Sequence, residues 1–290
     1  MSANAHIATM SLVVFVDDER LIVWARERAR LLAERHASHV LVLDASSPDV
    51  PSKPRELEAA IAAQLPSGVP RTLLWVAPKT ASDERFVLLA PQMRTILLDS
   101  SRARDDDAAL RDLVAFRAKT PQNTSIRDLA YLRLAPWQEL VADFFDERAF
   151  VEDLFDLQRI TITSGSDAEG YYLLGWLASR LAWEPERSRT FRPRKSAREI
   201  KYEIERDGQA RRVKRILLES HATRFVAELC EKDTGAVSLE VSGAKERPAR
   251  VAPLHDVDIT SLLERAMLSE QPDPVFLESL EVAGRLLSRA

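Results

Sequence analysis

Residues 12–18, Leu-Val-Val-Phe-Val-Asp-Asp, decide the fold class of the first half of the chain. Five apolar residues in a row have the length of a strand that is buried on both faces. The two aspartates end this run, and apolar residues then recur at helical spacing over residues 18–36. A buried strand followed directly by a helix is typical of a parallel α/β unit, because the helix returns the chain to the start of the next strand.

The same alternation of strand and helix continues downstream. Further strands are predicted over residues 39–43, 72–76 and 94–98, and helices over residues 53–65, 83–92 and 105–119. This alternation predicts a doubly wound, mostly parallel sheet with helices on both faces. The polar segment 120–124 interrupts the pattern. We therefore expect a first, Rossmann-like α/β domain over residues 1–121.

Residues 122–290 show a different pattern, which predicts an α+β domain with antiparallel hairpins. Helical spacing begins over residues 125–145. Two hairpins are expected, one through the turn Asp207-Gly208 and one through Asp233-Thr234-Gly235. The last predicted helices cover residues 258–268 and 275–287.

The composition is that of a globular protein of two domains. The chain has 290 residues, of which 46% are hydrophobic and 30% charged, and its formal net charge is −4. This balance argues against a dedicated nucleic-acid-binding protein. Cys230 is the single cysteine, which excludes an internal disulfide and a zinc site built from cysteines. The apolar runs have only strand length, and the first 11 residues lack a signal-peptide pattern. We therefore expect no membrane contact and a cytoplasmic location.

Charged residues are unevenly distributed along the chain. Residues 187–215 carry 12 basic and 4 acidic side chains, whereas residues 138–157 carry seven acidic side chains and one arginine. Such asymmetry often marks a docking surface. The acids interleaved in the basic segment favour an ion-paired sheet surface over a nucleic-acid site. In the acidic segment, the absence of a nearby histidine favours a solvated helix face over a di-metal site.

The sequence contains no motif for catalysis, cofactor binding or metal binding. None of its eight glycines forms Gly-x-Gly, and no Gly-x-x-x-x-Gly-Lys loop occurs, so both common nucleotide motifs are missing. His-Glu-x-x-His and Gly-x-Ser-x-Gly are also missing. We therefore expect no catalytic residue, no cofactor and no metal.

An alternative site lies at the predicted carboxyl edge of the first sheet, where doubly wound sheets bind ligands. Asp17, Asp44, Ser100 and Ser101 all follow predicted strands. Their carboxylates and hydroxyls could hold a sugar or a phosphate, as in an enzyme or a sensor for sugar phosphates. The competing interpretation of the segment around Ser100 is a helix cap.

The most apolar helix is predicted over residues 170–183. Tyr172, Trp176 and Trp183 share one stripe of this helix, and Arg180 is its only charged residue. A helix that is apolar nearly all round is buried in its own domain or against a partner. Burial in its own domain is the default, whereas an exposed tryptophan stripe would be typical of a binding surface.

Two segments together resemble a known family. Residues 128–140 read Asp-Leu-Ala-Tyr-Leu-Arg-Leu-Ala-Pro-Trp-Gln-Glu-Leu, and residues 172–183 read Tyr-Leu-Leu-Gly-Trp-Leu-Ala-Ser-Arg-Leu-Ala-Trp. They resemble the OpcA family of glucose-6-phosphate dehydrogenase assembly proteins. The similarity extends, in the same order, to residues 38–43, 74–75 and 96–101. The chain departs from the family pattern at Tyr131, Gln138 and Ala182, and residues 43–73 form a shorter stretch than in the family.

The resemblance implies a bacterial, non-enzymatic protein that acts in the oxidative pentose phosphate pathway. Such a protein binds glucose-6-phosphate dehydrogenase and promotes its active state, as an assembly factor or allosteric activator. The matching motifs give five candidate contact residues: Arg133, Trp137, Trp176, Arg180 and Trp183. The competing interpretation is packing inside the domain, with Arg133 paired to an acid of residues 138–157.

Overall fold

The computed structural model describes residues 10–36, 38–45, 47–76, 84–103, 105–194, 198–210, 212–230, 233–254, 258–268 and 272–289. The chain forms two compact units. The first comprises Met1–Leu129 and Asp258–Asp273, and the second comprises Ala130–Val257 and Pro274–Ala290. Each unit therefore includes a late segment of the chain. The division by tertiary contacts falls after Leu129. The expected boundary after residue 121 remains a proposal about which segments fold as separate domains.

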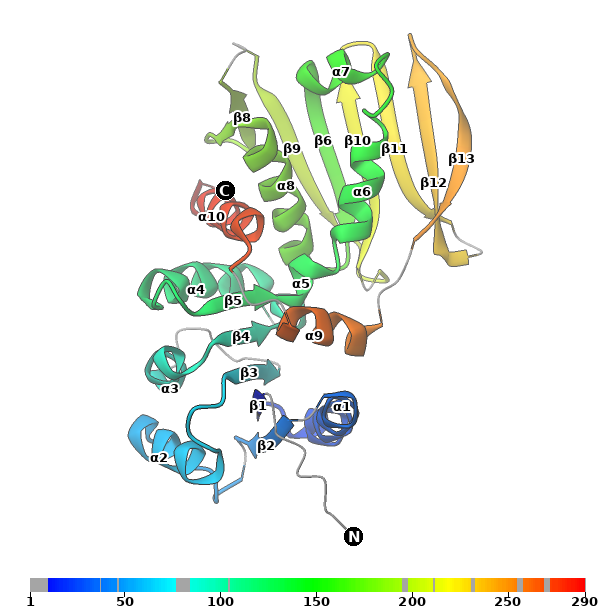
Figure 1. The fold of residues 1–290 in the computed structure, drawn as a ribbon. Helices are drawn as coiled ribbons and strands as arrows, with labels where there is room; N and C mark the ends of the chain where they lie inside the picture. The colour runs from blue at the N-terminus through cyan, green and yellow to red at the C-terminus, as the bar shows by residue number, and fades with distance from the viewer. Residues whose placement is uncertain are drawn as a thin grey trace. The chain divides into compact units, whose positions relative to one another are not determined.

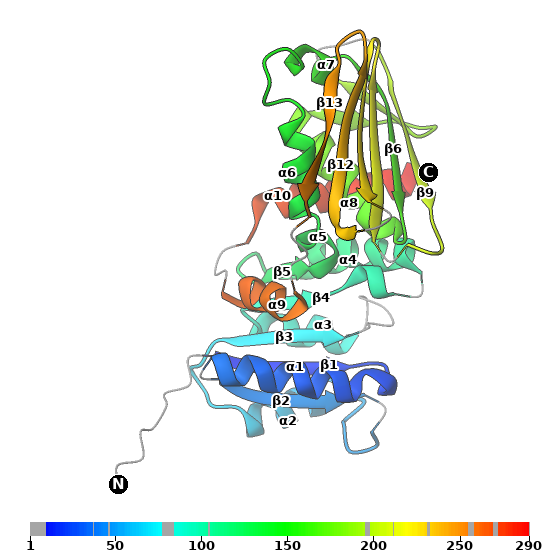
Figure 2. The same ribbon diagram turned by 90° about the vertical axis from the view of Figure 1, so that its right-hand side faces the viewer.

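The first unit is built on five parallel strands in the order β2-β1-β3-β4-β5. The strands are β1 (Met10–Val16), β2 (Ser38–Asp44), β3 (Arg71–Val76), β4 (Thr95–Leu98) and β5 (Ser125–Asp128). Helices α1 (Ile22–Arg35) and α9 (Ile259–Leu268) cover one face of this sheet, as Figures 1 and 2 show. The other face is covered by α2 (Pro54–Gln64), α3 (Glu84–Leu89) and α4 (Asp106–Lys119). Short 3-10 turns lie at Glu19–Leu21, Ala90–Gln92 and Ser100–Arg102. The predicted doubly wound parallel sheet is confirmed.

The burial of the strands follows from these two helical layers. Every residue from Leu12 to Val16 is 0% exposed, because each side chain meets a helical layer on its own face of the sheet. The strand order reverses between β1 and β3, which makes the carboxyl ends of these two strands the topological switch point.

Strand β5 corrects the prediction of a helix from residue 125. Residues Ser125–Asp128 pair in parallel with β4, so the helical region starts only after them. Four residues are too few for periodicity to separate a strand from a helix start. The pairing with β4 decides the outcome.

The second unit contains an eight-stranded mixed sheet in the order β13-β12-β11-β10-β6-β9-β8-β7. Its strands are β6 (Leu157–Ser164), β7 (Trp183–Pro185), β8 (Thr190–Pro193), β9 (Ile200–Arg206), β10 (Val213–Ser220), β11 (Thr223–Cys230), β12 (Asp233–Gly243) and β13 (Arg247–Pro253). Strands β6 and β9 are parallel, and the other neighbours are antiparallel. The predicted α+β arrangement with antiparallel hairpins is confirmed, including the hairpin of β11 and β12. Its predicted turn is wrong, because Asp233-Thr234-Gly235 form the start of β12.

One predicted hairpin is wrong. Strands β9 and β10, on either side of Asp207-Gly208, do not pair with each other, because β6 lies between them. The connecting segment passes around the end of β6: the Asp207 N–H donates to Ser164 O at 2.9 Å, and the Gly165 N–H donates to Arg212 O at 3.0 Å. Tertiary pairing with β6 therefore overrides the local turn signal.

Helices cover one face of this second sheet (Figures 1 and 2). They are α5 (Leu129–Leu132), α6 (Ala135–Asp143), α7 (Val151–Phe155), α8 (Asp167–Leu181) and α10 (Pro274–Arg289). Helices α8 and α10 approach closely at Gly175, where a Cβ atom would collide with the carbonyl oxygen of Ser279. This contact binds the last helix of the chain to the apolar helix of the second unit.

Candidate functional site

Asp17 forms a buried polar cluster at the switch point of the parallel sheet. Its Oδ2 accepts a hydrogen bond of 2.6 Å from Trp75 Nε1, and Arg85 lies 3.6 Å from its Oδ1. The Arg85 guanidinium also lies 4.9 Å from the ring centroid of Phe15. The carboxylate at the end of β1 is thus held by residues of β3 and α3.

Asp18 begins the helical segment that follows β1. Its Oδ1 accepts a hydrogen bond of 3.0 Å from the backbone N–H of Arg20. The Arg20 guanidinium binds the same carboxylate, which raises the pKa of Arg20 through the hydrogen bond and the charge of Asp18. A negative side chain therefore occupies the first turn, where a helix would otherwise attract an anion.

Ser100 and Ser101 lie after β4, where they take part in a second polar cluster. The Ser100 N–H donates to Asp128 Oδ1 at 3.1 Å, and Ser101 Oγ donates to Asp99 Oδ1 at 2.7 Å. The Ser100 side chain is buried, and within the described residues its Oγ has no hydrogen-bond partner. These serines do not cap α4, because Asp105 does so by accepting from the N–H of Ala108 at 2.9 Å.

The strand order spreads the alternative ligand residues along the sheet edge. Asp44 ends β2, Asp17 follows β1, and Ser100 and Ser101 follow β4, with β3 between β1 and β4. Neighbouring strands lie about 4.8 Å apart, so the residues span roughly 14 Å. The structure places them on one edge but does not gather them into one cluster.

Most of the five candidate contact residues lie inside the second unit. Trp137 and Trp183 are buried, and Trp176 is partly exposed. Arg133 Nε lies 3.3 Å from Glu169 Oε1, and these side chains are only 8% and 1% exposed. Arg180 forms an ion pair with Glu278 of α10. The structure thus gives Arg133 a partner on α8.

Glu169 is a site residue that sequence reasoning missed. Besides Arg133 it binds the backbone of β10, since its Oε2 accepts from the Val213 N–H at 3.0 Å. The sequence signal for Glu169 is its place in the first turn of an otherwise apolar helix. That place suggests a capping residue and not the acceptor of a buried arginine.

Basic side chains from elsewhere in the second unit neutralise much of the acidic segment 138–157. The ion pairs join Asp143 to Arg250, Glu147 to Arg247, Asp153 to Lys245 and Asp156 to Arg198. No group of three or more potential metal ligands occurs among the residues that the structure describes.

Asp153 is the buried member of this segment. Burial alone would raise the pKa of Asp153, but hydrogen bonds from Ser220 and Lys245, together with the Lys245 charge, hold it below its ordinary value. The carboxylate therefore stays ionised near neutral pH and fixes α7 to the β10–β11 turn and to Lys245.

Helix α7 also has an outward side that sequence reasoning missed. Val151 and Phe155 are 37% and 68% exposed and lie four residues apart, which places them on one face of the helix. Glu152 beside them is exposed. The only sequence signal is this spacing of two apolar residues within an acidic stretch.

The basic segment lies largely in an ion-paired sheet. Arg159 on β6 approaches Glu203 on β9 at 3.6 Å, and Lys214 binds Asp207 at 3.0 Å. Arg215 on β10 lies 3.6 Å from Glu228 on β11. These contacts agree with the prediction of an ion-paired surface.

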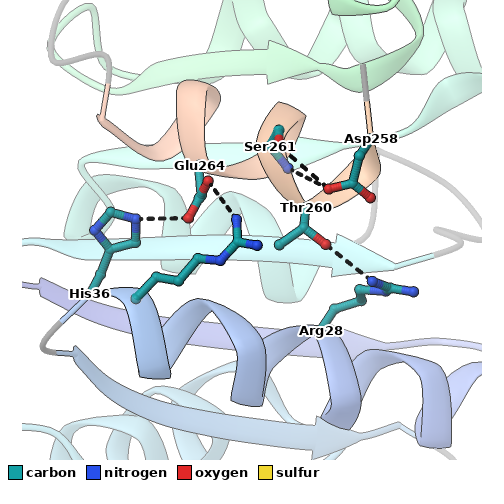
Figure 3. Close-up of polar contacts among 7 residues, drawn as sticks. Arg28, His36, Asp258, Thr260, Ser261 and Glu264 are labelled. Carbon is teal, nitrogen blue, oxygen red and sulfur yellow. Dashed lines mark hydrogen bonds and ion pairs between the residues drawn. The ribbon is translucent and has the colours of Figure 1, made fainter. Parts of the chain in front are cut away.

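Helix α9 completes the first unit by packing on α1 (Figure 3). Glu264 Oε2 accepts a hydrogen bond of 3.0 Å from the Arg35 guanidinium, and Glu264 Oε1 lies 3.2 Å from His36 Nε2. The Arg28 guanidinium donates a hydrogen bond of 3.1 Å to Thr260 Oγ1. Asp258 caps the helix by accepting from the Ser261 N–H, and this hydrogen bond lowers the pKa of Asp258. A late segment of the chain is thus part of the first unit.

Solved structures with the same architecture are oxidoreductases. The chain is similar to the 3-ketoreductase KijD10 of Actinomadura kijaniata, in complex with NADP and TDP-benzene, with a TM-score of 0.53 and 13% identity. That match covers 96% of this chain and 95% of the reductase. Levoglucosan dehydrogenase, in complex with NADH and L-sorbose, gives a TM-score of 0.53 and 11% identity over 94% of each chain. At these identities the likeness defines the class of fold alone, a parallel α/β unit followed by a unit with a mixed, mostly antiparallel sheet.

The family is defined by a separate match. The family described as the C-terminal domain of a glucose-6-phosphate dehydrogenase subunit matches residues 124–280, more than half of the chain. The chain therefore belongs to this family, the OpcA family, and the resemblance seen in residues 128–140 and 172–183 is confirmed.

Two curated relatives are provisionally named OxPP cycle protein OpcA. The one from Synechococcus elongatus is 30% identical over 240 residues, which cover 74% of this chain and 53% of the relative. The one from Nostoc punctiforme is 33% identical over 127 residues, which cover 43% of this chain and 27% of the relative. The matched region is about half of the first relative and about a quarter of the second.

The switch point of this chain does not fit the dinucleotide that those oxidoreductases bind. A dinucleotide site needs glycine in the first strand–helix turn and free N–H groups for the pyrophosphate. The turn after β1 has no glycine, and Asp17 is buried there. The Asp18 carboxylate accepts the hydrogen bond of the Arg20 N–H, so this N–H is not available to a pyrophosphate. A pyrophosphate at this place would have to displace the Asp18 carboxylate from that N–H. The described residues also include no helix that is long and apolar enough to cross a membrane.

Proposed function

We propose that this protein is a non-catalytic subunit that binds glucose-6-phosphate dehydrogenase and promotes its active state, as an assembly factor or allosteric activator. Membership of a family described as a subunit of that dehydrogenase supports the partner. The observation that carries the non-catalytic role is the buried Asp17 cluster at the end of β1. It fills the carboxyl end of β1, where doubly wound folds bind a dinucleotide, with a carboxylate that Trp75 and Arg85 already hold.

A partner that catalyses no reaction can activate the dehydrogenase only if it binds the active state more tightly than the inactive state. A ligand shifts a conformational equilibrium only by its difference in affinity between the two states. A tenfold preference for the active dehydrogenase corresponds to about 1.4 kcal/mol. In this role the protein acts in the cytoplasm, on a protein partner and not on nucleic acid or a membrane.

Steady-state kinetics of the dehydrogenase test this proposal. The turnover rate and the KM for glucose 6-phosphate are measured with the chain added at several molar ratios. We expect a saturating rise in kcat or fall in KM, while the chain alone shows no turnover. No change at any ratio would contradict the proposal, as would turnover by the chain alone.

A sugar-phosphate sensor is the second candidate function, favoured by the buried Ser100 hydroxyl that has no partner in the described residues. Ser100 lies at the sheet edge where doubly wound folds bind ligands. Isothermal titration calorimetry of the chain with glucose 6-phosphate and with NADP tests this candidate. Binding that Ser100→Ala abolishes would support it, and the absence of heat with both compounds would remove it.

A further inference from the structure

We propose that the outward face of α7, formed by Val151 and Phe155 and bordered by carboxylates, is the surface that docks the dehydrogenase. The occupant is a face of the dehydrogenase with an apolar pocket rimmed by lysine or arginine side chains. This inference rests on the proposed function and adds the surface through which that function acts.

The exposure of Phe155 is the first support. Among the large apolar side chains that are more than a third exposed in the described parts of the chain, Phe155 is the one aromatic residue. It is 68% exposed, and Val151 extends the same apolar stripe at 37%. Aromatic anchors surrounded by polar side chains contribute most of the affinity in many protein interfaces.

The inner side of α7 is held in place, which is the second support. Ser220 Oγ donates to Asp153 Oδ1 at 2.7 Å, and Lys245 Nζ donates to Asp153 Oδ2 at 2.9 Å. Phe150, at the start of the helix, packs edge-on against Phe225 with ring centroids 5.6 Å apart. Phe155 therefore projects from a backbone that is already ordered, so binding loses little conformational entropy.

The charge around the stripe indicates the chemistry of the partner. Glu152 lies beside Phe155, and Asp156 remains 43% exposed although it binds Arg198 at 2.6 Å. In the described residues the structure gives no ion pair to Glu152, which is exposed. The free Glu152 carboxylate and the exposed part of Asp156 favour a basic rim on the partner.

The same charge argues against a second copy of this chain as the occupant. In a symmetric dimer this patch would face its own copy, because a twofold contact uses the same surface on both subunits. The Glu152 carboxylates of the two copies, which have no ion pair within the described residues, would then repel each other. A heterologous partner with basic side chains avoids this repulsion.

The test measures affinity for the dehydrogenase with single variants of the full chain. Phe155→Ala should weaken binding at least tenfold in biolayer interferometry without changing the melting temperature, because the side chain is mostly exposed. The matched control is Val251→Ala, which truncates a 67% exposed residue of β13 in the same unit and should bind like the parent. Glu152→Lys should reduce the association rate severalfold, whereas Glu240→Lys on β12 should change it less.

The possible outcomes separate this inference from the proposed function. If the parent binds and Phe155→Ala binds within twofold of it, the docking surface is wrong while the proposed function stands. If Phe155→Ala changes only the self-association of the chain, measured by sedimentation velocity, the occupant is a second copy and the inference is overturned. If the parent itself does not bind, the proposed function fails and the inference fails with it.

Discussion

At the residue scale, the buried pair of Arg133 and Glu169 gives the sharpest prediction on stability. Glu169 is almost fully buried and accepts from both Arg133 and the Val213 N–H. Glu169→Ala leaves a buried guanidinium and a backbone donor without this acceptor, a loss that costs about 3–5 kcal/mol. We expect the free energy of unfolding to fall by about that amount in urea titrations followed by circular dichroism.

The control for this prediction is a surface ion pair of the same unit. Glu203 on β9 pairs with Arg159 on β6, and both side chains are about half exposed. Glu203→Ala should therefore cost less than about 1 kcal/mol. Equal losses in the two variants would show that the Glu169 contacts do not stabilise the fold.

Asp153 predicts how stability depends on acid. Its pKa is lowered in the folded protein relative to an ordinary aspartate, for which the value is about 3.9. Its contribution is therefore fully present above about pH 3.9 and is lost as the pH falls through the lower folded pKa. Asp153→Asn should be less stable than the parent at pH 7, and this difference should shrink toward pH 3 in urea titrations. A difference that grows with acid would contradict the pKa shift.

The turn between β7 and β8 predicts a stabilising substitution. Ser188 and Arg189 have φ values of 62° and 57°, in the left-handed region that costs a side chain about 1–2 kcal/mol. Ser188→Gly removes this strain, but it also raises the conformational entropy of the unfolded chain. We therefore expect the free energy of unfolding to rise by about 0.5–1 kcal/mol, measured in thermal melts. Ser188→Ala keeps the Cβ atom and should give no gain, which distinguishes relief of strain from loss of the hydroxyl.

The sequence predicted the apolar residues of the core well and the roles of single polar residues less well. Trp183 was expected inside the domain by default and is buried there, but it lies on β7 and not on the predicted helical stripe, because α8 ends at Leu181. The acceptor of Arg133 could not be predicted, because Glu169 lies 36 residues away and the two meet only through tertiary packing. Exposure of Phe155 could not be predicted either, since a short helix does not reveal which side faces solvent.

At the scale of elements, the contact of α8 with α10 predicts the effect of a single methyl group. A Cβ atom at Gly175 would collide with the Ser279 carbonyl group, and overpacking costs about 1–3 kcal/mol. The better helix propensity of alanine offsets up to about 1 kcal/mol of this cost. We expect Gly175→Ala to destabilise the protein by about 1–2 kcal/mol in urea titrations. Gly208→Ala, where no atom lies within 4 Å, should change stability by less than about 1 kcal/mol, and a larger effect there would undermine the steric argument.

Elements were predictable where local pattern and tertiary context agree. The run Leu12–Val16 forms β1 because it is buried on both faces, as its composition indicates. The turn at Asp207-Gly208 and the strand β5 were predicted less well, since a two-residue turn signal and a four-residue strand carry little information. In both cases the deciding interaction is with a distant strand, β6 for the first and β4 for the second.

At the scale of the whole molecule, the chain returns to each unit after leaving it. Helix α9 joins α1 in the first unit through Glu264 and Thr260, and α10 joins α8 in the second. No local pattern predicts such a return, because helix α9 has the same amphipathic signal wherever it packs. The family match over residues 124–280 spans α9 and part of α10, so it includes segments of both units.

The masses of the species in a mixture of the two proteins show most directly whether this chain forms a defined complex with the dehydrogenase. Purified chain and glucose-6-phosphate dehydrogenase from the same organism are mixed and examined by mass photometry over a range of ratios. We expect a new species with fixed stoichiometry that forms with the parent and with Val251→Ala. If the mixture contains only the masses of the separate proteins at every ratio, the proposed function is contradicted.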